Sequence, residues 1–220
     1  MVDLILQLRA EDVAANLEQV RERIAATGRS PDGVEVLAAV KYLPVEALAD
    51  LAAAGIRLVG ENRAQDLIAK QAAYPARFTW DFIGTLQSRK VSLLIPHVRY
   101  IQSVASDSAL AQLARHGTAS TQVLVEVNVA GEPGKAGVTP ADLPGFLERC
   151  PVEVVGLMTM PPQAADPEDS RPHFAALRRL AEQHGLRQLS MGTSQDYGVA
   201  VEEGATIIRL GSCLYGPRTS

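Results

Sequence analysis

Short apolar runs alternate with longer amphipathic segments along almost the whole chain, and this alternation predicts a parallel α/β fold. The apolar runs are rich in valine and isoleucine, whereas the segments between them are rich in alanine and leucine. Buried parallel strands and the helices that cover them have these two compositions. Residues 3–28 come first and predict a helix, because Leu6, Val13, Val20 and Ile24 recur at helical spacing.

The apolar runs predict eight strands, at residues 34–41, 56–60, 79–84, 98–104, 121–129, 152–160, 186–192 and 206–211. Every strand except the last is followed by a segment with helical spacing, as at residues 44–55, where Pro44 suits a helix start and Gly55 a helix end. Eight such repeats predict a single closed (β/α)8 TIM barrel, with residues 1–220 as one domain and an extra N-terminal helix. An open doubly wound sheet is the alternative, although no GxGxxG sequence follows the first strand.

Composition narrows the class of protein. A chain of 220 residues that is 47% hydrophobic can bury one full core. A net charge of -4 gives no reason to expect nucleic acid as a partner. Cys150 and Cys213 are far apart and form no metal-ligand pattern, which indicates a reduced, cytoplasmic setting without a zinc site. No signal peptide or membrane-spanning run is expected, and the lack of a long exposed apolar stripe predicts a monomer.

The chemistry of a barrel of this kind collects at the carboxyl ends of its strands. The residues at the predicted ends that could take part in binding are Lys41, Glu61, Asn62, Thr85, Gln87, Ser103, Ser106, Asn128, Met158, Thr159, Ser194, Arg209 and Ser212. Asn62 also begins an NRAQ sequence, which predicts a helix cap without excluding contact with a ligand.

Two cationic residues at strand ends are the strongest candidates for a binding role. Lys41 closes the apolar run VLAAV, where partial loss of water would suit its amine to Schiff-base formation. The alternative is an ordinary lysine whose ammonium group lies in water. Arg209 lies in TIIRLG and needs an acceptor, which is either a ligand atom or a carboxylate such as that of Glu126 or Glu61.

The last two strand ends carry glycine and serine together, in SMGTSQDYG and GSCLYG. Gly192 with Ser194, and Gly211 with Ser212, place hydroxyl groups beside backbone N–H groups. The loops after strands seven and eight form the usual phosphate site of such barrels. Ser194 is also a candidate N-cap, with Asp196 in the first turn of the helix, and the two interpretations are compatible.

Seven segments, taken in order, resemble those of the pyridoxal-phosphate homeostasis family, also called the alanine racemase-like N-terminal domain family. They are AAVKY, GENRAQDL, FIGTLQSRK, VEVNVAGEPGKAGV, GLMTM, LSMGTSQD and RLGSCLYGPR, and they span about residues 34–218. The resemblance implies a fold-type III barrel that binds pyridoxal 5′-phosphate (PLP). It also implies that Lys41 forms the Schiff base and that Arg209 faces the ring nitrogen. The remaining residues implied at the cofactor are Ser194, Gly211 and Ser212 for the phosphate, and Asn62, Met158 and Met191 near the ring.

The chain departs from the family's pattern at three places. Asp81 precedes FIG where members commonly have histidine, and Thr193 stands where methionine is usual. Both departures are expected to alter the outer pocket. The closing segment reads GSCLYG where GTxxFG is frequent, but Ser212 keeps the hydroxyl that a phosphate contact needs.

The function that the resemblance implies is a PLP carrier in intracellular homeostasis, without significant catalysis, catalytic residues or metal. PLP-dependent apo-enzymes are the implied recipients. An arginine at the ring nitrogen makes the cofactor a weaker electron sink, which agrees with this expectation. The alternative is an amino-acid racemase, which would need a tyrosine base from a second, β-rich domain; the chain has no room for one, and Tyr42 is expected to point away from Lys41. A barrel that binds another phosphorylated metabolite is the third possibility.

Overall fold

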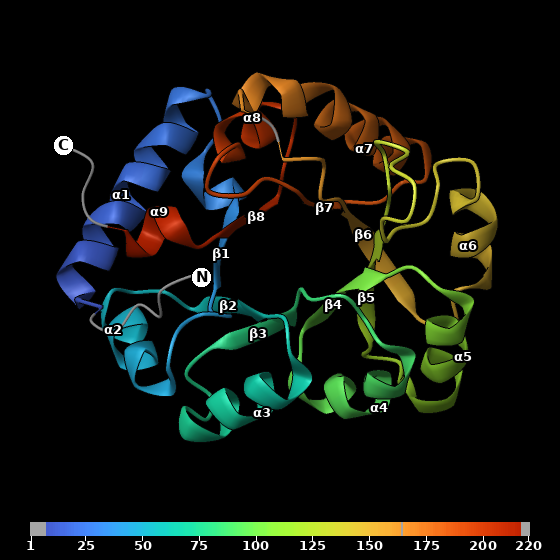
Figure 1. Cartoon of the computed structure of the whole chain (residues 1–220), viewed down its shortest axis with the longest axis horizontal. Helices are drawn as coiled ribbons and strands as arrows, with labels where there is room; N and C mark the ends of the chain where they lie inside the picture. The colour runs from blue at the N-terminus through green and yellow to red at the C-terminus, as the bar shows by residue number, and fades with distance from the viewer. Residues whose placement is uncertain (1–7, 164, 217–220) are drawn as a thin grey trace.

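Eight parallel strands form a closed barrel in the computed structural model, which describes residues 8–163 and 165–216. The strands are β1 Glu35–Ala39, β2 Leu58–Glu61, β3 Thr79–Phe82, β4 Tyr100–Val104, β5 Gln122–Glu126, β6 Glu153–Met158, β7 Gln188–Ser190 and β8 Ile207–Leu210. Each strand pairs with the next in sequence, and β8 returns to pair with β1, so that Leu37 lies opposite Arg209. Figure 1 shows this ring with the helices around it. The predicted (β/α)8 barrel is confirmed.

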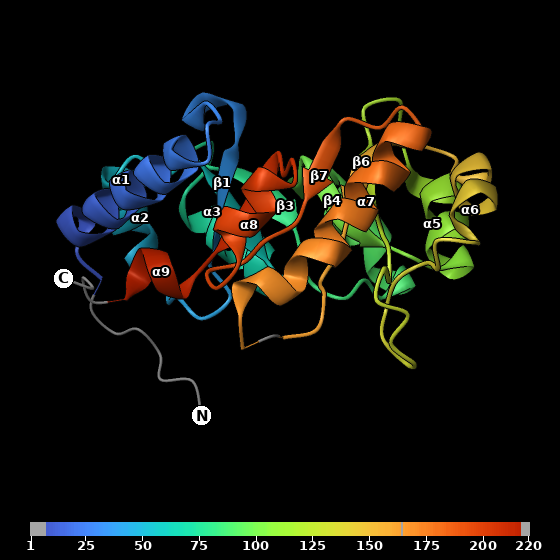
Figure 2. The ribbon, with the colours of Figure 1, turned by 90° about the horizontal axis from the view of Figure 1, so that it is seen from above.

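The helices lie outside the barrel, and all but the first and the last of them connect successive strands. They are α1 Ala10–Ala26, α2 Leu48–Ala53, α3 Ala64–Ala73, α4 Val91–Leu94, α5 Asp107–His116, α6 Leu143–Arg149, α7 Arg171–Gln183, α8 Tyr197–Glu202 and α9 Ser212–Tyr215. Five 3-10 turns accompany them: η1 Pro31–Gly33, η2 Val45–Ala47, η3 Ser88–Lys90, η4 Ile95–His97 and η5 Pro167–Ser170. In Figure 2 the carboxyl ends of the strands face downward, as do the loops that follow β5 and β6. No helix of the described residues has the length and apolar character needed to span a bilayer.

The N-terminal helix α1 belongs to the outer ring. It buries Val13, Val20 and Ile24 and packs against α2, α8 and α9. The Asn16 side chain donates hydrogen bonds to the carbonyl oxygens of Leu214 and Gly216, at 3.0 and 3.2 Å. The extra helix is therefore confirmed from Ala10 onward, and it anchors the end of the barrel chain, whereas residues 3–7 of the predicted helix lie outside the described residues.

Several predicted boundaries were wrong for local reasons. The helix expected after β3 is divided into η3, α4 and η4, because Pro96 lies within it. The helix expected from residue 139 starts at Leu143, after a turn in which the Asp142 N–H donates to the Thr139 carbonyl. A short helix, α9, follows the last strand, where none was expected.

The barrel interior has an apolar part and a polar part. Leu37, Leu58 and Ile207 form a small buried cluster that is separate from the large core between the strands and the helices. Asp81, Gln102, Ser190 and Arg209 are buried as well, and hydrogen bonds connect them. The list of polar residues inside the barrel therefore includes several that no strand-end argument identifies.

Candidate functional site

Three adjoining cavities lie at the carboxyl ends of the strands. The central cavity, of about 370 Å³, is lined by residues that include Lys41, Tyr42, Ser194, Arg209, Gly211 and Ser212. The inner cavity, of about 250 Å³, includes Asn62, Thr85, Ser103, Glu126 and Met158 and shares Lys41 and Arg209 with the central one. The outer cavity, of about 450 Å³, includes Met160, Gln163, Ser170 and Asp196. Thr193 borders all three, so they form one continuous opening.

Lys41 lies in a turn beyond β1 rather than at the strand end. The strand stops at Ala39, and the Leu43 N–H then donates to the Val40 carbonyl and turns the chain. The Lys41 side chain is exposed, so the expected partial loss of water around it is wrong for the protein without a ligand. Its Nζ lies 4.7 Å from the centre of the Tyr42 ring, which also corrects the expectation that Tyr42 points away. The amine is accessible from the central and inner cavities.

The backbone of this turn is held by a buried ion pair. Lys70 of α3 donates from Nζ to the Val40 carbonyl oxygen at 2.6 Å and lies 3.4 Å from Glu61 Oε1. Lys70 is 5% exposed and Glu61 is fully buried. Burial raises the pKa of Glu61, and the charge of Lys70 acts in the opposite direction. Glu61 is therefore a support of the Lys41 turn, and it lines none of the three cavities.

Arg209 is held by neutral acceptors. Its Nη1 donates to Ser190 Oγ at 2.6 Å, and its Nη2 donates to the Thr159 carbonyl oxygen and to Met160 Sδ, each at 2.8 Å. Within the described part of the chain, no carboxylate lies within 4.0 Å of Arg209, so the alternative of a structural ion pair with Glu126 or Glu61 is wrong. Burial lowers the pKa of Arg209 to about 10, which still leaves a full positive charge at neutral pH.

Glu126 supplies a carboxyl group to the inner cavity. Burial raises the pKa of its carboxyl group, whereas the positive charges of Arg209 and Lys135 act in the opposite direction. The side chain ends β5 and faces the same space as Lys41 and Arg209. The sequence suggested Glu126 only as an ion-pair partner, and the structure places it instead as a cavity-lining acid.

The loops after β7 and β8 meet at Ser194. Its Oγ accepts hydrogen bonds from the backbone N–H groups of Gly211 and Cys213, at 3.1 and 3.3 Å. Ser194 is therefore not the helix cap, because α8 begins at Tyr197 after Asp196. Gly192 has a φ of +91°, and a Cβ at this position would lie 2.5 Å from the Ala200 Cβ, so only glycine allows this close packing.

Backbone N–H groups at the same junction are free to bind a ligand. The structure provides no hydrogen-bond acceptor for the amides of Ser194, Gln195 and Ser212 among the described residues. All three residues line the central cavity, and Ser212 adds an exposed hydroxyl group. Unsatisfied amides and hydroxyls that converge on one cavity are suited to an anionic oxygen group.

Of the three residues implied near the ring of the cofactor, two line a cavity and one lies in the core. Asn62 and Met158 line the inner cavity. Asn62 caps nothing, since α3 has Arg63 at its N-cap position and no side-chain cap bond, so the cap interpretation is wrong. Met191 is fully buried among the core residues and lines none of the three cavities, which corrects its placement near the ring. Neighbouring residues of a strand face opposite sides, and Ser190 takes the inward position.

Other candidates at strand ends have structural roles. Ser106 accepts from the Ala109 N–H and caps α5, Asn128 binds Glu132 of its own loop, and Thr159 donates to the Val127 carbonyl. Gln87 accepts from the exposed Arg89. Among residues 8–163 and 165–216 there is no cluster of three His, Cys, Asp or Glu residues that could hold a metal ion.

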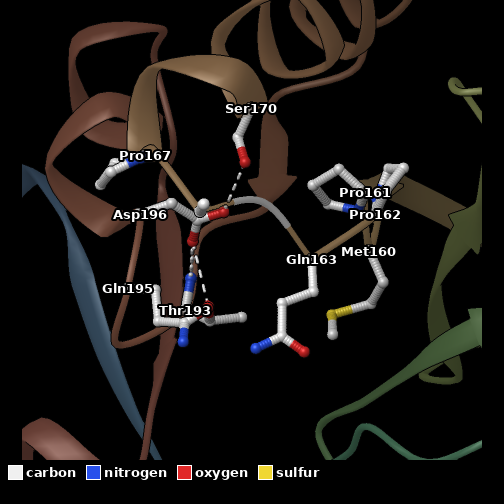
Figure 3. Close-up of a pocket in the computed structure, with 10 residues that line it drawn as sticks. Met160, Pro161, Pro162, Gln163, Pro167, Ser170, Thr193, Gln195 and Asp196 are labelled. Atoms are coloured by element: carbon white, nitrogen blue, oxygen red, sulfur yellow. Dashed lines mark hydrogen bonds between the residues drawn. The ribbon is translucent and has the colours of Figure 1, made fainter.

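The outer cavity contains residues that sequence reasoning missed. In Figure 3, Gln163 lies between the Thr193–Asp196 turn and Met160. Asp196 accepts from the Ser170 hydroxyl at 2.9 Å and from the Thr193 N–H at 2.7 Å, which fastens the loop after β6 to the loop after β7. Of the first two departures from the family's pattern, Thr193 lines the outer cavity, whereas Asp81 lies deep inside the barrel and is not part of that cavity. Gln163 stands in a loop without a recognisable motif, so the sequence carried no signal for it.

Comparison with known proteins identifies the family. The sequence matches the alanine racemase N-terminal domain family over residues 9–219. The pyridoxal phosphate homeostasis protein of Aquifex aeolicus is 37% identical over 222 residues, which cover 94% of this chain and 97% of the relative. The chain belongs to the pyridoxal phosphate homeostasis family. The resemblance that the seven sequence segments indicated is thus confirmed.

Solved structures of two proteins place this member of the homeostasis family among its relatives. PipY of Synechococcus elongatus, solved with PLP bound, has a TM-score of 0.77 and 33% identity, and the match covers 93% of this chain and all of PipY (100%). Alanine racemase of Corynebacterium glutamicum has a TM-score of 0.73 at 13% identity, and the match covers 62% of that chain. The second likeness is one of fold alone.

Proposed function

We propose that this chain binds PLP at the mouth of the barrel, with Lys41 as the covalent anchor, and takes part in intracellular PLP homeostasis without significant catalysis. The observation that carries the proposal is the central cavity, which brings the Lys41 amine, the Arg209 guanidinium and the free amides around Ser194 and Ser212 to one space. These three groups match the aldehyde, the ring nitrogen and the phosphate of PLP.

The residues of the cavity fit the cofactor in charge and in size. The free amides and the hydroxyl groups of Ser194 and Ser212 would bind the phosphate, and a cavity of about 370 Å³ is in the usual range for small ligands. Arg209 Nη2 now donates to the thioether of Met160, a weak acceptor on a side chain that is 43% exposed. A ring nitrogen is a stronger acceptor, so exchange of Met160 for it would be favourable.

Arg209 favours a carrier over an enzyme. Bound PLP supplies an aldehyde that reacts with amines and a ring that can accept electrons. Arg209 is a donor that keeps its proton, so it would hold the ring nitrogen without protonating it and would limit electron withdrawal. A racemase would also need a second base on the opposite side of the substrate, and we propose that this chain provides none.

The first experiment is an absorption spectrum of the purified protein with PLP, followed by borohydride reduction and peptide mapping. We expect the visible band of a lysine-bound cofactor and a reduced adduct on Lys41. No band and no adduct would contradict the proposal and would favour a barrel for another phosphorylated metabolite. Strong conversion of L-alanine to D-alanine, lost on changing Lys41 to alanine, would favour the racemase instead.

The phosphate contacts give a second prediction. Ser194→Ala and Ser212→Ala are each expected to weaken PLP binding by about 1.5–3 kcal/mol, the range for a hydrogen bond to a charged group. Equilibrium dialysis with PLP measures the change, and Ser106→Ala, which alters a cap outside the three cavities, serves as a matched control. Unchanged retention in both variants would show that the phosphate lies elsewhere.

We also propose how the carrier is used in the cell. The carrier would be a cytoplasmic monomer that consists of the single barrel domain and delivers PLP to PLP-dependent apo-enzymes. Two free cysteines, Cys150 and Cys213, agree with a reducing compartment. The exposed positions of Lys41 and Ser212 agree with delivery, because a recipient can reach the cofactor site from solvent.

A further inference from the structure

A chain of buried polar side chains leads from Arg209 across the inside of the barrel. Arg209 Nη1 donates to Ser190 Oγ at 2.6 Å, Ser190 Oγ donates to Gln102 Oε1 at 2.6 Å, and Gln102 Nε2 donates to Asp81 Oδ2 at 2.7 Å. Asp81, Gln102 and Ser190 are all fully buried. These residues come from β3, β4, β7 and β8, so the chain connects strands on different sides of the ring (Figure 1).

Asp81, at the end of this hydrogen-bonded row that is farthest from Arg209, is fixed by a second arginine. Arg99 donates from Nε to Asp81 Oδ1 at 3.0 Å and from Nη2 to Asp81 Oδ2 at 2.8 Å. Its Nη1 also donates to Glu35, an exposed residue at the start of β1. The two-pronged contact keeps the Asp81 carboxylate in one orientation at the amino-terminal side of the barrel.

The Asp81 carboxylate determines the direction of every hydrogen bond from Gln102 through Ser190 to Arg209. A carboxylate only accepts, so Gln102 must present its NH₂ group to Asp81 and its carbonyl oxygen to Ser190. Ser190 has one proton, which it gives to that oxygen, and its lone pairs are then left for Arg209. If the Gln102 amide were reversed, its carbonyl oxygen would face the Asp81 carboxylate, and the contact between these two residues would be lost.

We infer that Asp81, Gln102 and Ser190 are positioning residues that orient the Arg209 guanidinium for contact with the ring nitrogen of PLP. This inference rests on the proposed function. Apolar side chains fill the neighbouring part of the interior, where Leu37, Leu58 and Ile207 pack together. A buried polar chain is a poor means of stabilising a barrel by comparison, because each of its groups must be stripped of water. What these hydrogen bonds achieve is to hold the Arg209 guanidinium in a single orientation.

The test uses full-length protein and a PLP analogue that lacks the aldehyde, 4-deoxypyridoxine 5-phosphate. This probe cannot bond to Lys41, so its affinity reports on the phosphate and ring contacts alone. Ser190→Ala is expected to lower the affinity about tenfold, since the acceptor that orients a charged donor is lost. Ser190→Thr keeps the hydroxyl and is expected to retain affinity. Ser106→Ala, which removes a hydroxyl that caps α5 outside the three cavities, is the matched control.

Two further measurements separate positioning from general support of the fold. Gln102→Met is expected to reduce affinity as Ser190→Ala does, and the double variant is expected to lose little more, because both act through one chain. In the cofactor-free protein, the ¹⁵N signals of the Arg209 guanidinium are expected to shift in Ser190→Ala and Gln102→Met but not in Ser106→Ala. Unchanged analogue affinity and unchanged Arg209 signals in both variants would overturn the inference while parental PLP binding stands. A parent that binds neither PLP nor the analogue would overturn the proposed function, and the inference with it.

Discussion

Changing Lys41 to alanine is expected to abolish covalent retention of PLP and leave the barrel folded. The chain has four lysines, and Lys41 is the one that lines the central and inner cavities. Lys70 is buried against Val40 and Glu61, and Lys135 is paired with Glu132. No other lysine of the described residues lines the three cavities, and the loss of an exposed side chain costs little stability.

Intact-mass measurement after incubation with PLP and borohydride reduction checks this expectation. The parent is expected to gain one reduced cofactor, whereas Lys41→Ala is expected to gain none above the background of unspecific labelling. Lys90→Ala is the matched control, since it removes another lysine amine outside the three cavities. Undiminished labelling of Lys41→Ala at a single other lysine would place the cofactor in a different site.

The sequence predicted the barrel and the face that carries the site, because both depend on repeating patterns. Eight apolar runs separated by helical segments are compatible with few topologies. Parallel strands in a barrel bring their carboxyl ends to one face. Lys41, Arg209 and the two Gly/Ser loops could therefore be assigned to a common site although they are far apart in the chain. The structure joins them around the central cavity.

Details that depend on single residues were not predictable in this way. Lys41 is exposed because β1 stops at Ala39, two residues earlier than its apolar run suggests. Met191 faces the core because the neighbouring Ser190 faces inward, and a shift of one residue in a strand reverses its side. Ser194 binds two N–H groups of a distant loop instead of capping its own helix. Each outcome is decided by tertiary contacts.

The hydrogen-bonded polar residues inside the barrel are the clearest example of a feature that tertiary contacts decide. Gln102 and Ser190 are 88 residues apart and stand in otherwise apolar strands, where each alone resembles a minor interruption of the pattern. The sequence distinguishes Asp81 only as a departure from the histidine that is common in the family. Only closure of the ring places β4 against the side chains of β7 and reveals one connected path to Arg209.

Lys70→Met is expected to cause the largest loss of stability, of about 3–5 kcal/mol in the free energy of unfolding. The change leaves Glu61 as a fully buried carboxylate without a counter-charge. Among the described residues, Glu61 Oε2 already has no hydrogen-bond partner, and Lys70 is the positive charge that lies against this carboxylate. The variant also removes one of the two hydrogen bonds to the Val40 carbonyl, which precedes Lys41, and is therefore expected to weaken PLP retention.

Urea unfolding as a function of pH measures the effect and its cause. Burial raises the pKa of Glu61 in the folded protein, and loss of Lys70 removes the charge that opposes this rise. The folded state of Lys70→Met then holds a proton that the unfolded state releases, so stability is retained at low pH and falls as the pH rises through the folded pKa. Lys70→Met combined with Glu61→Gln is expected to recover most of the stability at neutral pH and to lose this slope. A small loss without pH dependence in the single variant would mean that the pair contributes little, and the Lys41 turn would then be held by its backbone bonds alone.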